Sequence, residues 1–290
     1  MPDKFTATWV SHSSIHDYLI CPRSYFLKNV YKDPATNKKI KVMTPALALG
    51  QAVHETLEAL SGLKKEERFR EPLPERFAQA WEKVSGKRGG FFNADVEYKY
   101  RRRGEEMIAR VYRHPGPIER LAVKIQQDLP YFWLSEPEEI MLCGKIDWLE
   151  YLPDQEAVHI IDFKTGKERE DEESLQLPIY LLLTQRCQKW KVVGVSYWYL
   201  DTNDMLTEKM LPEIEEAEKR VLDIARKIKL ARQLKKFDCP NGTDGCMACG
   251  PYERVIQKAG ECVGEDNFRS LVYILPQLQK NNEMAESVVL

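Results

Sequence analysis

The sequence predicts an α/β protein, in which a helical region precedes the core and a cysteine-bearing segment follows it. Two changes of pattern along the chain predict this class. Apolar residues recur at helical spacing early in the chain, and β-branched and aromatic runs begin near residue 138. A helical pattern returns between these runs and again after them. Because strands and helices alternate from that point on, we expect a sheet with helices packed against it.

Length and composition are those of an ordinary globular chain. Its 290 residues suit one large domain, or one domain with an insertion, and can form a sizeable core. The formal net charge is only −2, so any nucleic-acid binding must rely on a local basic groove. The strongest apolar run, residues 177–183, is far too short for a membrane span, and the N-terminus lacks a signal-peptide pattern. We therefore expect a cytoplasmic protein without a membrane partner, whose 7 cysteines are thiols or metal ligands.

The early helices are predicted from apolar spacing and from residues that end helices. Residues 13–31 form a helix that breaks at Pro22, since proline lacks the amide hydrogen that a helix interior needs. A second helix begins near Pro45 and ends before Gly62. Residues 63–135 are highly charged and mostly helical in pattern, so we expect them to form a helical insertion.

The later elements alternate between strands and helices. β-branched and aromatic runs predict the strands, and amphipathic spacing predicts the helices. The expected order is strands over 138–152 and 156–164 joined by a turn, a helix over 173–187, strands over 191–201 and 205–211, and a long helix over 212–237. A cysteine-containing loop and a short tail follow.

An acid and a base interrupt the apolar strand predicted over residues 156–164. Asp162 and Lys164 are two positions apart and face the same side, whereas Phe163 faces the opposite side, toward the core. A simple ion pair at a strand end is one interpretation. However, a hairpin would bring Asp147, on the preceding strand, close to Asp162. Two neighbouring carboxylates repel unless a positive charge lies between them, and Mg²⁺ commonly binds one or two carboxylates, so the hairpin predicts a divalent cation site.

Two predicted helices offer further polar groups for this site. His54 lies four positions after Gly50 on one helix face, and Gly50 allows another backbone to approach closely. By itself a histidine at this position is more often a packing residue than a ligand. Gln176 and Tyr180 are four apart on the helix after the strand. Taken alone they could be a polar edge and a core aromatic.

Together these residues resemble a known family. The ordered set is similar to the RecB-type branch of the PD-(D/E)XK nuclease superfamily, including the CRISPR-associated nucleases of that branch, over much of residues 11–200. Its parts are Gly50-x-x-x-His54, Gly144-Lys-Ile-Asp147, Ile161-Asp162-Phe-Lys164-Thr-Gly166 and Gln176-x-x-x-Tyr180. Each part is weak alone, but their order and spacing match. The resemblance implies a restriction-endonuclease-like core, a mixed central sheet flanked by helices, in a single domain over residues 1–290 with 63–135 inserted.

The resemblance also implies a role for each of these residues. Its metal site would hold Mg²⁺ or Mn²⁺ through His54, Asp147, Asp162 and the main-chain carbonyl of Phe163. Lys164 would position or activate the attacking water and place a positive charge near the developing oxyanion. Gln176 and Tyr180 would steady this lysine and the nucleic-acid backbone.

Three of the cysteines are close together near the C-terminus. Cys246 and Cys249 form a C-x-x-C motif, and Cys239 lies seven positions earlier. In a reducing compartment, three thiols at this spacing predict a metal site within a cysteine-rich segment over residues 237–262. Tetrahedral zinc or a [4Fe–4S] cluster requires a fourth ligand.

The resemblance suggests Cys21 as that fourth ligand. Many RecB-type nucleases bind an iron–sulfur cluster through one cysteine near the N-terminus and three near the C-terminus. In their commonest version a further cysteine follows the C-x-x-C motif, where this chain has Val255. Cys262 is therefore a rival fourth ligand, and zinc is an alternative to the favoured iron–sulfur cluster.

The activity that the resemblance implies is metal-dependent hydrolysis of phosphodiester bonds in DNA. It further implies exonuclease action on single-stranded ends, in DNA repair, recombination or CRISPR-type processing. No phosphate-binding loop of the Walker type occurs, so a helicase or recombination partner would be a separate protein. Two alternatives are a catalytically inactive nuclease fold that binds DNA or protein, and an iron–sulfur redox sensor.

Overall fold

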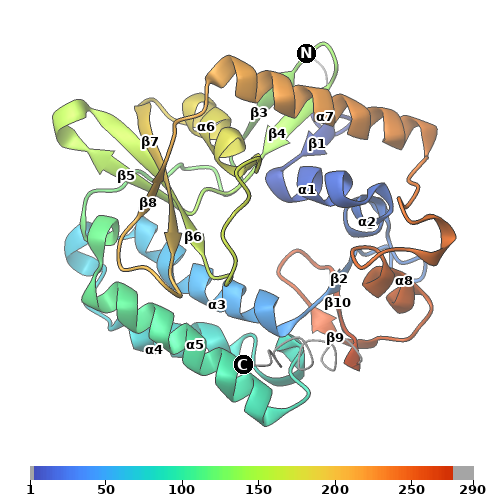
Figure 1. Ribbon diagram of the computed structural model, residues 1–290, viewed down its shortest axis with the longest axis horizontal. Coiled ribbons are helices and arrows are strands. Elements are labelled where there is room, and N and C mark those ends of the chain that lie inside the picture. The colour runs from blue at the N-terminus through green and yellow to red at the C-terminus, as the bar shows by residue number, and fades with distance from the viewer. Residues whose placement is uncertain (1–2, 277–290) are drawn as a thin grey trace.

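A computed structural model describes residues 3–276 and has the predicted α/β architecture (Figure 1). Its helices are α1 His12–Ile20, α2 Pro22–Tyr25, α3 Pro45–Glu58, α4 Leu73–Glu82, α5 Ala94–Arg113, α6 Gln176–Cys187, α7 Ile214–Leu234 and α8 Gly250–Ile256. Its strands are β1 Thr8–Val10, β2 Ile40–Val42, β3 Tyr131–Ser135, β4 Ile140–Cys143, β5 Trp148–Leu152, β6 Ala157–Lys164, β7 Lys191–Tyr199, β8 Thr207–Lys209, β9 Glu261–Glu265 and β10 Leu271–Ile274. Among these described residues, no helix is both long enough and apolar enough to cross a membrane.

The largest sheet has the strand order β5-β6-β7-β8 and is mixed. β5 and β6 form the predicted antiparallel hairpin, whose turn is a short 3-10 helix over Pro153–Gln155. β6 pairs in parallel with β7, which pairs antiparallel with β8. The parallel pair requires a crossover, and α6 supplies it between β6 and β7. The mixed sheet therefore follows from one tight turn and one helical connection.

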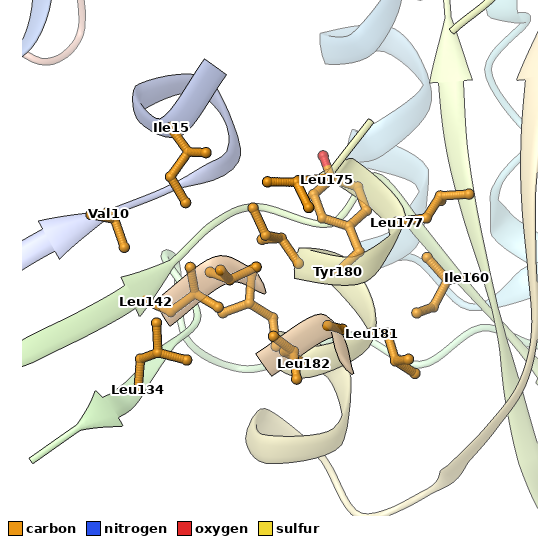
Figure 2. Close-up of a cluster of buried hydrophobic side chains, with 14 of the residues drawn as sticks. Val10, Ile15, Leu134, Leu142, Ile160, Leu175, Leu177, Tyr180, Leu181 and Leu182 are labelled. Carbon is orange, nitrogen blue, oxygen red and sulfur yellow. The ribbon is translucent and has the colours of Figure 1, made fainter. Parts of the chain in front are cut away.

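Helices cover both faces of this sheet because the strand residues alternate between two cores (Figure 1). Trp148, Ile161 and Phe163 pack in a core with α3, α4 and α5. On the opposite face, Ile160 packs in a core with α6 and α7. Figure 2 shows the leucines of α6 lying between Leu142 of the β1-β4-β3 sheet and Ile160 of the main sheet. α6 is apolar on several sides because it is buried between two sheets.

The strand predicted over residues 138–152 is two strands in the structure, so that prediction is wrong in its extent. β4 ends at Cys143, and β5 begins at Trp148 in a different sheet. At Gly144 the chain passes so close to α6 that an added Cβ would lie 2.8 Å from a methyl carbon of Leu183. The resulting break places Asp147 immediately before β5, at the end of the ladder.

Two further predictions about the elements are corrected. The mostly helical stretch does contain α4 and α5, but its last residues, Tyr131–Ser135, form strand β3. The C-terminal tail is also structured, because β9 and β10 pair with β2 in a third sheet. The β2 pairing joins the segment before α3 to the segment after the cysteine motif. Residues 277–290 of the tail lie outside the described part of the chain.

Candidate active site

Asp147 and Asp162 lie opposite one another at the open end of the β5–β6 hairpin. Trp148 and Ile161 are the last pair of the ladder, and the two aspartates occupy the next position on each chain segment, just beyond that pair. β5 offers no backbone partner beyond Trp148, and Asp147 Oδ2 instead accepts a hydrogen bond of 2.8 Å from the Phe163 amide. The amide and carbonyl of one residue leave the same edge of a strand, so the Phe163 carbonyl faces this end of the hairpin as well.

Helix α3 brings an imidazole and a third carboxylate to the same place. His54 Nδ1 lies 3.5 Å from Asp147 Oδ2 and 3.1 Å from Glu58 Oε1. His54 and Glu58 are one helical turn apart, which puts them on one face of α3. Their ligand atoms and one of Asp147 all lie within 4.8 Å of one another. The side chain of His54 remains 28% exposed, so solutes can reach the group.

Lys164 occupies the other side of Asp162 and is surrounded by acceptors. Its Nζ lies 3.1 Å from Asp162 Oδ2 and 2.7 Å from Glu170 Oε2, and it donates to Gln176 Oε1. Burial alone would lower the pKa of Lys164, but Asp162 and Glu170 outweigh it and raise that pKa. The amine is therefore charged, and acts as a donor and a positive charge instead of as a base. The ring of Tyr197 lies below it, with Nζ 4.8 Å from the centroid.

Gln176 and Tyr180 of α6 lie beside Asp162 and Lys164 and form one wall of the candidate site. Gln176 Nε2 donates to Asp162 Oδ1 over 2.7 Å and to the Tyr180 hydroxyl over 3.3 Å. Its amide therefore holds the lysine through one end and the aspartate through the other. Burial, followed by the charges of Asp147 and Asp162, raises the pKa of Tyr180 well above 10.0, so the hydroxyl stays neutral.

The loop after Lys164 is fixed to the helices on the opposite face of the sheet. The Thr165 carbonyl accepts a 2.8 Å hydrogen bond from Arg103 of α5, which also pairs with Asp201 at 2.9 Å. At Gly50 of α3, an added Cβ would lie 3.3 Å from Thr165 Oγ1. The close approach expected at Gly50 is therefore present, although the approaching group is a side chain.

The two aspartates are in different electrostatic states. Burial would raise the pKa of Asp147, but His54 and the Phe163 amide outweigh it and lower that pKa. Burial raises the pKa of Asp162 to about 8, and the charge of Asp147 is the second contribution to this rise. Burial would lower the pKa of His54, but Asp147 and Glu58 hold it well above 6.5. Without a cation, protons must therefore reduce the negative charge of this group.

These residues fit a divalent cation by their chemistry. The donor set is carboxylate oxygen and imidazole nitrogen, with a carbonyl at the same edge, and hard cations prefer oxygen ligands. Asp162 Oδ2 is buried, and its contact with Lys164 Nζ at 3.1 Å is an ion pair without hydrogen-bond geometry. This oxygen can therefore accept a further ligand, and a bound cation would supply one.

The sequence analysis missed two acidic residues of this site, Glu58 and Glu170. Glu58 could have been found from its spacing, because it follows His54 by four positions on a predicted helix. Glu170 lies in a polar loop, where no periodicity predicts the position of a side chain. In the structure, Glu170 Oε1 accepts a 2.7 Å hydrogen bond from the Ser174 hydroxyl, and this bond orients the carboxylate toward Lys164.

Glu58→Gln is expected to weaken Mn²⁺ binding by about 10- to 100-fold, because Glu58 contacts His54, a candidate ligand, and disturbing such a contact usually has an effect of this size. Titration of the protein with Mn²⁺, followed by electron paramagnetic resonance, measures the change. Glu55→Gln is the matched control, because Glu55 lies on the same helix and pairs instead with Lys83. Equal Mn²⁺ affinities for both variants would exclude Glu58 from the metal site.

Four cysteines form a second group that could hold a metal. Cys21 from the α1–α2 junction meets Cys239, Cys246 and Cys249, and the four sulfurs lie within 4.8 Å of one another. Cys249 Sγ is 3.6 Å from Cys246 Sγ and 3.7 Å from Cys239 Sγ. Cys21 and Cys249 are buried, whereas the other two are partly exposed.

The remaining cysteines lie outside this group. Cys262 is exposed on β9, and its sulfur approaches the Gly264 carbonyl. The geometry therefore favours Cys21 over Cys262 as the fourth member. Cys143 is buried and Cys187 half-buried, and their thiols contact backbone carbonyls within the core region.

The fold and the site define the class of the protein, an α/β protein with a carboxylate-rich group suited to a divalent metal at the end of a mixed sheet. A family model for the PD-(D/E)XK nuclease superfamily matches residues 9–255, and the chain belongs to this superfamily. Its members are metal-dependent phosphodiesterases, so the chain has the fold of a metal-dependent nuclease. The comparison with curated proteins finds no match.

Proposed function

We propose that the protein is a RecB-like, metal-dependent nuclease that hydrolyses phosphodiester bonds in DNA. One observation carries the proposal: Asp147, Asp162 and Lys164 meet His54 at one end of one sheet. A structural ion pair needs one acid and one base, whereas here buried carboxylates crowd together. Such an arrangement is costly for stability and is explained by the chemistry that it allows.

The metal site proposed here is formed by His54, Asp147, Asp162 and the Phe163 carbonyl, with Glu58 bound to His54 or serving as a ligand itself. Mg²⁺ or Mn²⁺, when bound, would lower the pKa of water and stabilise negative charge on a phosphate. Its binding would also remove the repulsion between the carboxylates. The protons that reduce their charge in the metal-free protein would then be released.

Lys164 and its partners supply the other half of the proposed chemistry. Its charged amine would hold the attacking water and stabilise the charge that develops on the phosphate oxygens. Glu170 and Gln176 fix the amine in place, so little reorganisation would be needed during the reaction. Tyr180 and Gln176 would steady the nucleic-acid backbone at the wall formed by α6.

The four-cysteine group would hold a [4Fe–4S] cluster in this proposal, with Zn²⁺ as the alternative. A bound cluster would join the α1–α2 junction to the segment before α8, and so connect distant parts of the chain. Its role would be structural. The remaining elements of the proposal are a single domain in which residues 63–135 are a helical insertion, and a place in the cytoplasm, where the thiols stay reduced.

Action on single-stranded ends, in repair, recombination or CRISPR-type processing, completes the proposal. The test uses DNA labelled at one end, in single- and double-stranded form, with RNA of the same sequence and with Mg²⁺ or Mn²⁺. We expect shortened single-stranded DNA products whose lengths give the polarity. If no substrate is cleaved with either ion, but DNA is bound, the chain is an inactive binding module. Cleavage that tracks the oxidation state of an iron–sulfur cluster would instead support a redox sensor.

A further inference from the structure

A groove of about 950 Å³ extends from the candidate active site between α3 and the β9–β10 hairpin. Leu47, Gly50 and His54 of α3 line one wall, and residues 263–268 of the hairpin line the other. Figure 1 shows this hairpin beside the N-terminal end of α3. His54 belongs both to this groove and to the proposed metal site. A ligand in the groove would therefore adjoin the substrate bound at that site.

The hairpin holds an aromatic ring in solvent at its tip. Phe268 is 88% exposed, although a phenylalanine ring gains about 1.5–3 kcal/mol from full burial. Asp266 Oδ1 accepts from the Phe268 amide over 3.0 Å and from the Ser270 amide over 2.9 Å, which fixes the turn beneath the ring. Across the groove, Leu47 of α3 is also 51% exposed. The groove therefore offers apolar faces on both of its walls.

The same groove contains a cation that the protein itself does not neutralise. Arg88 is exposed on the 3-10 helix over Gly86–Gly89 and lines the groove. Among the described residues, Arg88 has no ion-pair partner, whereas Lys83 and Lys145 in the same groove pair with carboxylates of α3. Guanidinium groups bind phosphate through two parallel hydrogen bonds, so Arg88 is suited to an anionic backbone.

We propose that this groove binds the unpaired nucleotides next to the cleaved phosphate, with Phe268 stacking on a base and Arg88 contacting a phosphate. The inference rests on the proposed nuclease function and adds to it a subsite that would bind single-stranded DNA beside the metal site. A base inside a duplex is covered on both faces by its neighbours, so an aromatic ring can stack only on a base that has left the duplex. Stacking accepts any base, and the subsite would therefore bind without sequence preference.

The experiment measures the affinity of fluorescein-labelled oligo(dT) by anisotropy, with full-length protein carrying Asp162→Asn so that the probe is not cleaved. Phe268→Ala is expected to weaken binding by about 5- to 150-fold, which corresponds to the 1–3 kcal/mol of one stacked base. Phe268→Trp should restore it. Arg88→Gln should reduce the salt dependence of binding by about one phosphate contact. Phe5→Ala is the matched control, because Phe5 is 85% exposed and lies outside the groove.

Each outcome decides the subsite separately from the nuclease function. Unchanged oligo(dT) affinity in Phe268→Ala, or equal weakening in Phe5→Ala, overturns the subsite even where the wild type cleaves DNA. That result would instead fit a hairpin tip that contacts a protein. Conversely, oligo(dT) binding that depends on Phe268, together with a wild-type chain that cleaves no DNA with either metal ion, upholds the subsite and overturns the nuclease function. A blunt duplex provides the last comparison. If the Asp162→Asn parent binds it as weakly as the Phe268→Ala variant does, the result supports single-stranded DNA as the ligand of the subsite.

Discussion

Asp162→Asn is expected to reduce DNA cleavage by about 10³-fold or more while DNA binding is retained. Removing one preorganised group at a developing charge costs about 10²–10³-fold, and this change also removes a proposed metal ligand. Asparagine has the shape of aspartate and can still accept the hydrogen bond from Gln176. Lys164 keeps its second partner, Glu170, so the fold should be preserved. The measurement is the single-turnover rate on end-labelled DNA with Mg²⁺ or Mn²⁺.

The matched control is Asp154→Asn, an exposed aspartate in the turn of the same hairpin. It should cleave DNA at the wild-type rate. A rate within tenfold of wild type for Asp162→Asn would show that the carboxylate has no part in catalysis, and would leave the two aspartates as structural.

The same variant should also change how stability depends on pH in the metal-free protein. Burial and the charge of Asp147 raise the pKa of Asp162 from 3.8 to about 8 on folding. The folded state therefore binds a proton that the unfolded state has lost, and the stability contributed by Asp162 falls as the pH rises from 3.8 to about 8. Asp162→Asn should remove this fall in stability with rising pH. A substitution that the fold merely tolerates would leave the pH dependence of stability unchanged. Thermal unfolding across that pH range is the readout.

Cys249→Ser is expected to abolish the metal binding proposed for the cysteine group and to lower the thermal unfolding temperature by on the order of 10 °C. A cross-link between distant segments contributes about 2–5 kcal/mol, and each kcal/mol moves Tm by about 2–4 °C in a domain of this size. The loss arises because Cys249 is buried at the centre of the group, within 3.7 Å of two other sulfurs. Iron, sulfide and zinc analysis of the purified protein, with calorimetry, measures both effects.

Cys262→Ser is the control for this prediction. Cys262 is exposed on β9 and outside the group, so its replacement should leave metal content and Tm unchanged. The assignment of the four ligands would be contradicted if Cys262→Ser lost the metal and Cys249→Ser kept it.

The main sheet and the facing aspartates could be predicted because both depend on local rules. Strand alternation places Asp162 and Lys164 on one face, and a tight turn between two strands fixes an antiparallel partner. Gln176 and Tyr180 share one helix face by their spacing, but their place in the site was implied only by the family resemblance. The structure brings all of these side chains together with Asp147, as the sequence analysis expected.

The parts that could not be predicted depend on contacts between distant segments. β2 and β10 contain three and four residues, too few for a clear alternation, and they pair although they lie near opposite ends of the chain. The break at Gly144 results from the close passage of the chain over Leu183, which no local pattern reveals. Glu170 reaches Lys164 from an irregular loop for the same reason. The groove beside Phe268 is likewise lined by segments that are far apart in the sequence, α3 and the β9–β10 hairpin.

The most direct test of the metal site is an anomalous-difference map from crystals soaked in Mn²⁺. The account predicts a peak in contact with carboxylate oxygens of both Asp147 and Asp162, at about 2 Å, and beside His54. Soaked crystals of Asp162→Asn should lose that peak. A protein that cleaves DNA with Mn²⁺ but shows no peak there, or holds the ion through other side chains, would contradict the account.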